Sequence, residues 1–324
     1  RQKGLRVVSP GRRPSVLVVR RMADPHGPGQ LRVGSVRVWV LPAIMGGMAS
    51  AALTQASIEP MRLRKREELA NVPHPFPYQG SKRGLAHAIL PLVPPSTNRL
   101  IEPFCGSAAV SIAARYTRRA KTALIADINA PLIDLWNAIL SDPGALADAY
   151  ESMWHEQQAA PREFFWKARE ACNANPQPAQ LLSLLNRIVK GAVRYSKEGL
   201  FNQSPDHRRL GAKPAGVRER ISSVSRTMAG TEAVVSDFAP LALAASRDDL
   251  VYMDPPYQGT TNVRDHRYMR GLPREEFEPV LAELVEREIS FIVSYDAVRE
   301  DGKYGQPISP SLGLTHLHLA AGRS

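Results

Sequence analysis

A doubly wound α/β fold with an inserted helical domain is predicted by three features of the sequence. Short apolar runs typical of buried strands recur at residues 99–101, 123–126, 233–235, 250–252 and 290–294. Segments with helical periodicity alternate with the first of these runs, which is typical of a mostly parallel sheet covered by helices. A long helical block at residues 144–228 interrupts the alternation and predicts an insertion.

The first predicted elements follow one another closely. A short helix at residues 82–90 precedes the first strand, and a helix at residues 108–116 follows it. The second strand ends at Asp127, and the helix at residues 131–140 has a proline in its first turn, where proline is favoured. Within the insertion, residues 144–193 are predicted to be helical throughout.

The composition indicates a globular protein of a reducing compartment. Hydrophobic residues make up 44% of the 324 residues, enough for one large domain or two ordinary ones. The cysteines, Cys105 and Cys172, are too few for a disulfide scaffold and stand at no metal-ligand spacing. We therefore expect a cytoplasmic protein with no metal site. The apolar stretch at residues 38–58 is interrupted by proline, glycine and polar residues, so no membrane insertion is expected.

Positive charge is concentrated in two segments. The net charge is +11, and residues 1–70 hold thirteen Lys or Arg against four Asp or Glu, whereas residues 187–226 hold ten against three. Residues 1–70 lack the pattern of the rest, which predicts a basic extension that is disordered or not native. The segment at residues 187–226 contains a polar loop, residues 194–213, and suits contact with nucleic acid. Solvated surface is the alternative interpretation.

The segment Asp254-Pro255-Pro256-Tyr257 follows a buried strand and suits recognition of an amino group on a planar ring. Two prolines fix the backbone and remove two N–H donors, which leaves rigidly aimed carbonyl acceptors beside the Asp254 carboxylate. Tyr257 adds a flat face for stacking. Such a socket is what an amino-methyltransferase acting on adenine, cytosine or glutamine needs. A strand that ends in a proline turn is the structural alternative.

The segment EPFCGSAAV, which runs from Glu102, joins the first strand to a helix. Small residues at such a turn let a ligand approach the backbone at a helix N-terminus. The next strand ends in Asp127, where an acid can accept hydrogen bonds from a ribose. Upstream, PFPYQGSK places an aromatic residue, a glycine and a lysine directly before a helix.

In this order the motifs closely resemble those of the Dam-type, or α-group, family of DNA adenine N6-methyltransferases. The resemblance covers residues 74–323 and implies a Rossmann-like catalytic domain made of residues 71–143 and 229–324, with a target-recognition insertion at residues 144–228. It implies that S-adenosylmethionine donates a methyl group to an adenine flipped out of double-stranded DNA. A monomer is expected, and a cognate restriction endonuclease stays open as a partner.

The resemblance also implies roles for individual residues. The residues matched to the S-adenosylmethionine site are Tyr78, Lys82, Phe104, Gly106, Asp127, Asp237 and Phe238. The residues matched to the target amino group are Asp254, Pro255, Pro256 and Tyr257. The segment RYSKEGLFNQS resembles a loop at the edge of the family's recognition domain, which makes Arg194 and Asn202 expected DNA contacts, with an ordinary surface turn as the alternative. Arg208, Arg209 and Lys213 are expected contacts because they lie in the polar, basic loop.

Two features depart from the family pattern. Ala108 stands where the family often has a second glycine, and we expect alanine to be tolerated there because it is small and can begin a helix. The family fold usually continues into a last antiparallel strand after a segment like LTHLHLA, so a C-terminally truncated fragment is expected. Two other functions stay open: an amino-methyltransferase acting on RNA or protein, and an inactive DNA-binding remnant. The long insertion favours duplex DNA.

Overall fold

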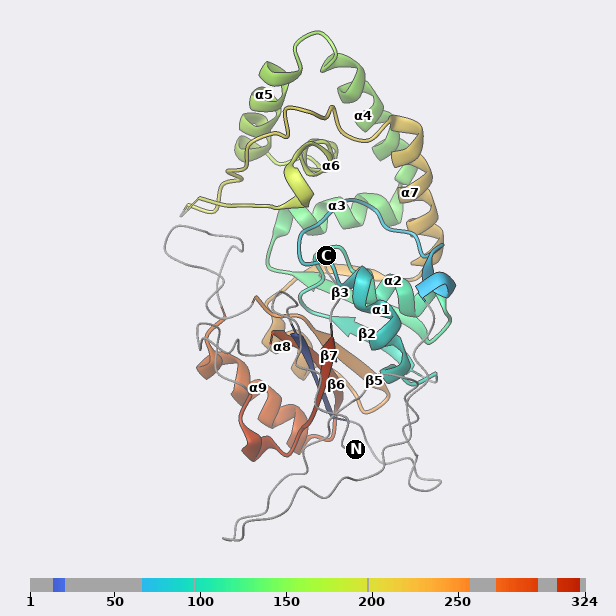
Figure 1. Cartoon of the computed structure of the whole chain (residues 1–324), viewed down its shortest axis with the longest axis vertical. Helices are drawn as coiled ribbons and strands as arrows, with labels where there is room; N and C mark the ends of the chain where they lie inside the picture. The colour runs from blue at the N-terminus through green and yellow to red at the C-terminus, as the bar shows by residue number, and fades with distance from the viewer. Residues whose placement is uncertain are drawn as a thin grey trace, which may run out of the picture.

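One sheet of seven strands, with helices on both faces, forms the base of the computed structural model (Figure 1). The structure describes residues 14–20, 66–95, 97–196, 198–256, 272–296 and 308–320. The strand order is β4-β3-β2-β5-β6-β1-β7. The strands are β1 Pro14–Arg20, β2 Thr97–Glu102, β3 Ala120–Asp127, β4 Glu232–Val235, β5 Asp249–Met253, β6 Ser290–Asp296 and β7 Thr315–Ala320.

Helices cover the sheet and form a lobe beside it. The α-helices are α1 Ala86–Ile89, α2 Ala109–Tyr116, α3 Ala130–Ser141, α4 Pro143–Glu156, α5 Pro161–Ala174, α6 Pro178–Arg187, α7 Pro214–Thr227, α8 Phe238–Leu243 and α9 Arg274–Glu286. Short 3-10 turns occur at Arg66–Leu69, Lys82–Leu85, Leu90–Leu92, Val189–Gly191 and Pro310–Leu312. No helix in the described ranges is long and apolar enough to cross a membrane.

Five neighbouring strands, from β4 to β6, are parallel to one another. The central strand β5 is buried along its whole length, as expected for a parallel sheet covered on both faces. Its alternate side chains enter different cores: Leu250 and Tyr252 pack with the helices from α1 to α7, while Val251 and Met253 pack with α8 and α9. The predicted doubly wound α/β fold is therefore confirmed.

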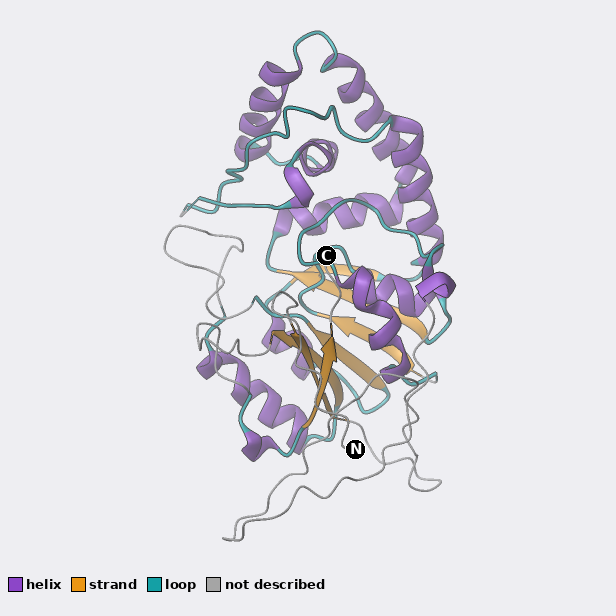
Figure 2. Cartoon of the chain, in the orientation of Figure 1, coloured by secondary structure: helices purple, strands orange, loops and turns teal. Residues whose placement is uncertain are grey.

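The lobe formed by helices α4 to α7 lies in the segment where the sequence predicts an insertion (Figure 2). Its buried residues, among them Leu182 and Val217, belong to the same hydrophobic cluster as Leu100 of the sheet. The lobe therefore packs on the sheet through a continuous core. Its role in target recognition remains a prediction.

The expectation of unbroken helix over residues 144–193 is wrong. Helices α4, α5 and α6 each begin with a proline, which is favoured in the first turn but cannot continue a preceding helix. Helix α6 ends at Arg187 because Ile188 is extended and forms a bridge with Pro205. Gly191, three residues later, takes the left-handed φ of 61°.

Strand β1 corrects the expectation that all of residues 1–70 lie outside the fold. Residues Pro14–Arg20 pair antiparallel with β6 on one side and with β7 on the other. The segment PSVLVVR is rich in valine, which favours strands, but its neighbours in the sequence gave no sign of a partner. An antiparallel strand is thus present beside β7, and it comes from the N-terminal part of the chain.

Ala108 also differs from expectation. It precedes helix α2 in the left-handed conformation, with φ 46° and ψ 38°, instead of beginning the helix. Alanine in this region costs roughly 1–2 kcal/mol relative to right-handed backbone, and Ala108 is fully buried. The loop geometry is therefore the one that a glycine would adopt, and the surrounding packing holds alanine in it.

Candidate active site

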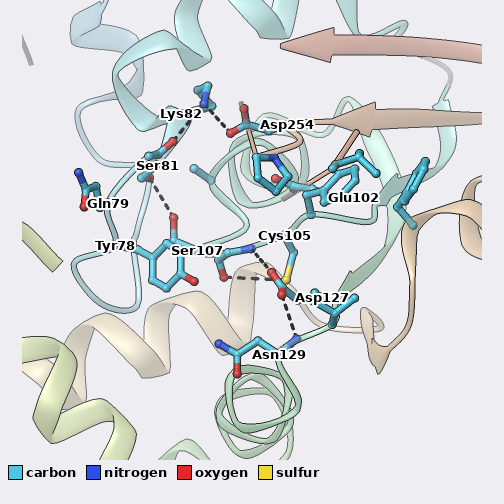
Figure 3. A pocket seen from close by; sticks show the side chains of 18 of the residues that line it. Tyr78, Gln79, Ser81, Lys82, Glu102, Cys105, Ser107, Asp127, Asn129 and Asp254 are labelled. Carbon is cyan, nitrogen blue, oxygen red and sulfur yellow. Dashed lines mark hydrogen bonds and ion pairs between the residues drawn. The ribbon is translucent and has the colours of Figure 1, made fainter. Parts of the chain in front are cut away.

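One pocket lies at the carboxyl ends of β2, β3 and β5, which adjoin one another in the sheet (Figure 3). Parallel strands present their carboxyl ends at one edge of a sheet, so residues distant in sequence meet there. Most residues predicted from the sequence for the methyl donor and the target base line it: Tyr78, Lys82, Phe104, Gly106, Asp127, Asp237, Phe238, Asp254 and Pro256. Pro255 is buried beside the pocket, and Tyr257 lies outside the described residues.

Gly106 and Tyr78 form one wall of the pocket. Gly106 has a φ of 47°, and a Cβ atom at this position would lie 3.0 Å from Cε1 of Tyr78. The Gly106 carbonyl accepts a hydrogen bond of 2.9 Å from Nε1 of Trp136. Ser81 and Ser107 join the two segments by a hydroxyl hydrogen bond of 2.9 Å. Glycine is needed here because the loop and the aromatic ring are in close contact.

Asp127 lies at the end of β3 and faces the same pocket. Its carboxylate accepts hydrogen bonds from the backbone N–H of Gly106 at 3.3 Å and of Asn129 at 3.0 Å. Burial raises the pKa of Asp127 to about 6, although these N–H groups favour the ionised form. The carboxylate is therefore ionised at neutral pH and available as an acceptor for a hydroxyl group.

An aromatic pair, Phe104 and Phe238, also lines the pocket. The rings of Phe104 and Phe238 stack with centroids 5.2 Å apart and an interplanar angle of 25°. Asp237 precedes Phe238 and caps helix α8, since its side chain accepts a hydrogen bond of 3.4 Å from the backbone N–H of Ala239. Flat apolar faces beside a carboxylate suit a purine ring.

Asp254 forms an ion pair with Lys82, in which Nζ and Oδ2 are 2.5 Å apart. The lysine is 9% exposed and also donates to the carbonyl of Gly80 at 3.2 Å. Two motifs separated by most of the chain, PFPYQGSK and the Asp-Pro-Pro segment, are thus joined inside the pocket. The sequence predicted that both belong to the site but not that they touch.

Glu102, Asn129 and Tyr195 also line the pocket and were not predicted as site residues. Glu102 ends β2 and accepts hydrogen bonds from the backbone N–H of Ser111, at 2.9 Å, and from its hydroxyl. Burial raises the pKa of Glu102 to about 8, so the carboxyl is mostly protonated at neutral pH. Its place as the first residue of EPFCG could have indicated it, since it directly precedes the loop.

The comparisons with known proteins agree with this geometry. Residues 78–318 match the family model of the D12 class N6 adenine-specific DNA methyltransferases. The chain belongs to this family. The matched range contains the described part of the pocket, and the resemblance inferred from the sequence motifs is confirmed.

Individual relatives resemble this chain at low sequence identity. A DNA adenine methylase of Haemophilus influenzae is 25% identical over 227 residues, which cover 67% of this chain and 77% of the relative. The retron Ec67 DNA adenine methylase of Escherichia coli is 29% identical over 173 residues, 51% of this chain and 57% of the relative. The type II methyltransferase M.MjaIII of Methanocaldococcus jannaschii is 26% identical over 171 residues, which cover 49% of this chain and 58% of the relative. The chain thus spans a little over half the length of two of these relatives.

The residues predicted to contact DNA lie on the loop between α6 and α7, outside the pocket. Arg194, Asn202, Arg208, Arg209 and Lys213 are all exposed. Arg208 and Arg209 both face the buried Asp206, with nitrogen–oxygen distances of 3.0 Å and 3.6 Å. Hydrogen bonds from Arg208 hold the pKa of Asp206 below its usual range. The carboxylate offsets part of the positive charge of this pair.

Proposed function

We propose that the protein is a site-specific methyltransferase that transfers a methyl group from S-adenosylmethionine to N6 of an adenine flipped out of duplex DNA. The observation that carries the proposal is the presence of Asp254 and Asp127 in one pocket, with the Phe104–Phe238 pair beside them. Asp254 would then contact the target amino group, and Asp127 would contact the methyl donor. A monomer in the cytoplasm is proposed, with a cognate restriction endonuclease left open.

The residues present fit S-adenosylmethionine. Gly106 has no side chain, so the Tyr78 ring packs directly on the loop, and both residues line the pocket that would hold the donor. Asn129 is 4% exposed, and its Oδ1 atom has no hydrogen-bond partner among the residues that the structure describes, which leaves an acceptor at the pocket wall. Asp127 would hold the ribose, and Phe104 and Phe238 would hold the adenine ring of the donor. S-adenosylmethionine supplies an electrophilic methyl group when bound.

Asp254 and the carbonyl of Pro255 would accept the two hydrogens of the target N6 amino group. The lone pair of this nitrogen is delocalised into the ring, and two acceptors favour the tetrahedral geometry in which it becomes nucleophilic. Lys82 holds the Asp254 carboxylate at 2.5 Å, so the acceptor is oriented before the base arrives. Tyr257 is proposed as the stacking face for the flipped base, which costs a few kcal/mol to extrude.

Methylation of DNA in cells tests the proposal. The protein is expressed in a bacterial strain that lacks adenine methylation, and the genomic DNA is sequenced with detection of N6-methyladenine. The expected result is modification of adenine within one short sequence. Unmodified DNA from cells that contain the folded protein would contradict the proposed activity, and methyl transfer to RNA instead would identify the alternative substrate.

Binding of the methyl donor should depend on pH through Asp127. Its pKa lies at about 6, so the charged acceptor is present above that value and is lost as the pH falls below it. Asp127→Asn should weaken binding by about 1–3 kcal/mol at neutral pH, the scale of a charge-assisted hydrogen bond. It should also remove the pH dependence. Titration with S-adenosylhomocysteine at several pH values measures both effects.

Protonation of Asp127 does not itself destabilise the folded protein at low pH. The pKa of Asp127 is higher in the folded protein than its ordinary value of 3.8. Its contribution to stability is therefore fully present below the ordinary value and declines as the pH rises through about 6. Equal affinity of the wild-type protein on both sides of that pH would place the ribose contact on another residue.

Lys213 should contribute one phosphate contact. Lys213→Ala should weaken binding to every duplex and flatten the dependence of log K on log salt by about 0.9 unit. Arg218→Ala is the matched control from the same basic segment, because Arg218 is already paired with Asp148 at 2.5 Å and Glu151 at 3.0 Å. The affinity of both variants and of the wild type for duplex DNA is measured at several salt concentrations. Equal slopes for Lys213→Ala and the wild type would contradict the contact.

A further inference from the structure

The loop that carries the expected DNA contacts also forms part of the pocket wall. Tyr195 lines the pocket and pairs with Phe201 at the base of a short hairpin. Nδ2 of Asn129 donates a hydrogen bond to the Tyr195 hydroxyl. The backbone N–H of Asn129 in turn donates to Asp127 at 3.0 Å. A chain of two hydrogen bonds therefore connects the proposed ribose acceptor to the hairpin.

A second contact connects the same loop to another segment that lines the pocket. The carbonyl of Gly191 accepts a hydrogen bond of 3.0 Å from the backbone N–H of Gln79. A Cβ on Gly191 would lie 2.5 Å from the carbonyl oxygen of Pro77, so the two backbones touch where a side chain cannot fit. Tyr78, which stands between Pro77 and Gln79 in the sequence, lines the pocket. The loop thus contacts the pocket lining at two places.

The hairpin itself is held as one unit. Asn173 of helix α5 pairs with the backbone of Phe201, accepting from its N–H at 2.8 Å and donating to its carbonyl at 3.1 Å. The backbone N–H of Asn202 donates to the carbonyl of Arg194 at 2.7 Å. Arg194 and Asn202, both expected to contact DNA, therefore flank the rung formed by Tyr195 and Phe201. A displacement of Tyr195 would displace both.

We propose that Tyr195 is a positioning residue that couples the methyl-donor pocket to the DNA-contacting hairpin. A ligand held by Asp127 restrains Asn129, and Asn129 restrains Tyr195 in the position that presents Arg194 and Asn202. Donor binding should therefore tighten DNA binding, and DNA should tighten donor binding by the same factor, because coupling between two binding sites is reciprocal. This inference rests on the proposed function, since it assumes that the pocket and the hairpin bind these two ligands.

The test is a binding cycle with S-adenosylhomocysteine, which cannot be turned over, and a duplex that contains the site found by sequencing methylated DNA. The affinity for each ligand is measured with and without saturating amounts of the other. The wild type should show a coupling factor of about 5 or more. Tyr195→Phe should bring this factor close to one, while each ligand alone still binds.

Tyr150→Phe is the matched control. The Tyr150 hydroxyl donates to the carbonyl of Ala212 at 2.6 Å, so this variant also removes one buried hydroxyl bond from the insertion but leaves the pocket intact. It should keep the wild-type coupling factor. Comparable melting temperatures of the two variants would show that a loss confined to Tyr195→Phe is not a general effect on stability.

Three results would overturn the inference: no coupling in the wild type, coupling retained in Tyr195→Phe, or coupling lost equally in Tyr150→Phe. If Tyr195→Phe does not fold, Asn129→Ala removes the same hydrogen bond from its other end and must lose the coupling. Failure of the proposed function gives a different outcome, because the wild type would then fail to bind one of the two ligands at all.

Discussion

Asp254→Asn should lower methyl transfer by at least about a hundredfold, the scale on which one preorganised electrostatic contact acts in a reaction. The amide is nearly isosteric with the carboxylate but offers only one acceptor atom and adds an NH₂ donor, which opposes the hydrogens of the target amino group. Binding of S-adenosylhomocysteine should change much less. Initial rates of methyl incorporation into duplex DNA, together with donor affinity, give this contrast.

Asp249→Asn provides the control for this substitution. Asp249 begins the same strand β5 and pairs with Arg99 at 2.9 Å, so, like Asp254, it is a carboxylate with a cationic partner, and it is buried. It does not line the pocket. Asp249→Asn should lower the stability of the protein, while the rate of methyl transfer per folded molecule is retained. Methylation by Asp254→Asn within a few-fold of the wild type would remove Asp254 from the chemistry.

Deletion of residues 1–20 should strongly destabilise the protein, because it removes β1 from between β6 and β7. Each of these strands loses a ladder of six residue pairs with β1. Strand β7 then keeps no neighbour among the strands that the structure describes. We expect the melting temperature to fall on the order of 10 °C, which corresponds to a few kcal/mol in a protein of this size. Thermal unfolding followed by circular dichroism measures the change.

A shorter deletion, of residues 1–12, separates the strand from the charge that precedes it. This variant keeps Pro14–Arg20 and should melt close to the wild-type temperature, although it loses most of the basic residues before the strand. If both deletions leave the melting temperature unchanged, the original interpretation of residues 1–70 as an extension outside the fold is the correct one.

The pocket was largely predictable from the sequence because its residues stand at the ends of strands. Asp127 and Asp254 each end or follow an apolar run, and parallel strands bring such ends to one edge of the sheet. Local pattern therefore sufficed to place both in one site. The left-handed conformation of Ala108 was not predictable, since alanine adopts it only where the surrounding packing imposes it.

Contacts between segments that are distant in the sequence could not be predicted from the local sequence pattern. The Lys82–Asp254 ion pair, the close approach of Gly191 to Pro77 and the Asn129–Tyr195 hydrogen bond each join residues that are unremarkable by themselves. Strand β1 was missed for the same reason, because a short valine-rich run becomes a strand only when neighbours supply its hydrogen bonds.

The position of β1 also has a consequence for the order of folding during synthesis. Residues Pro14–Arg20 leave the ribosome early, whereas their partners in β6 and β7 are among the last described residues to be made. The parallel strands β2 to β5 and the helical lobe can pair while the chain is still growing, but β1 must wait until β6 and β7 have emerged. Contacts of such long sequence separation form slowly. Until then this apolar segment stays unpaired, and unpaired strands are prone to associate with strands of other chains.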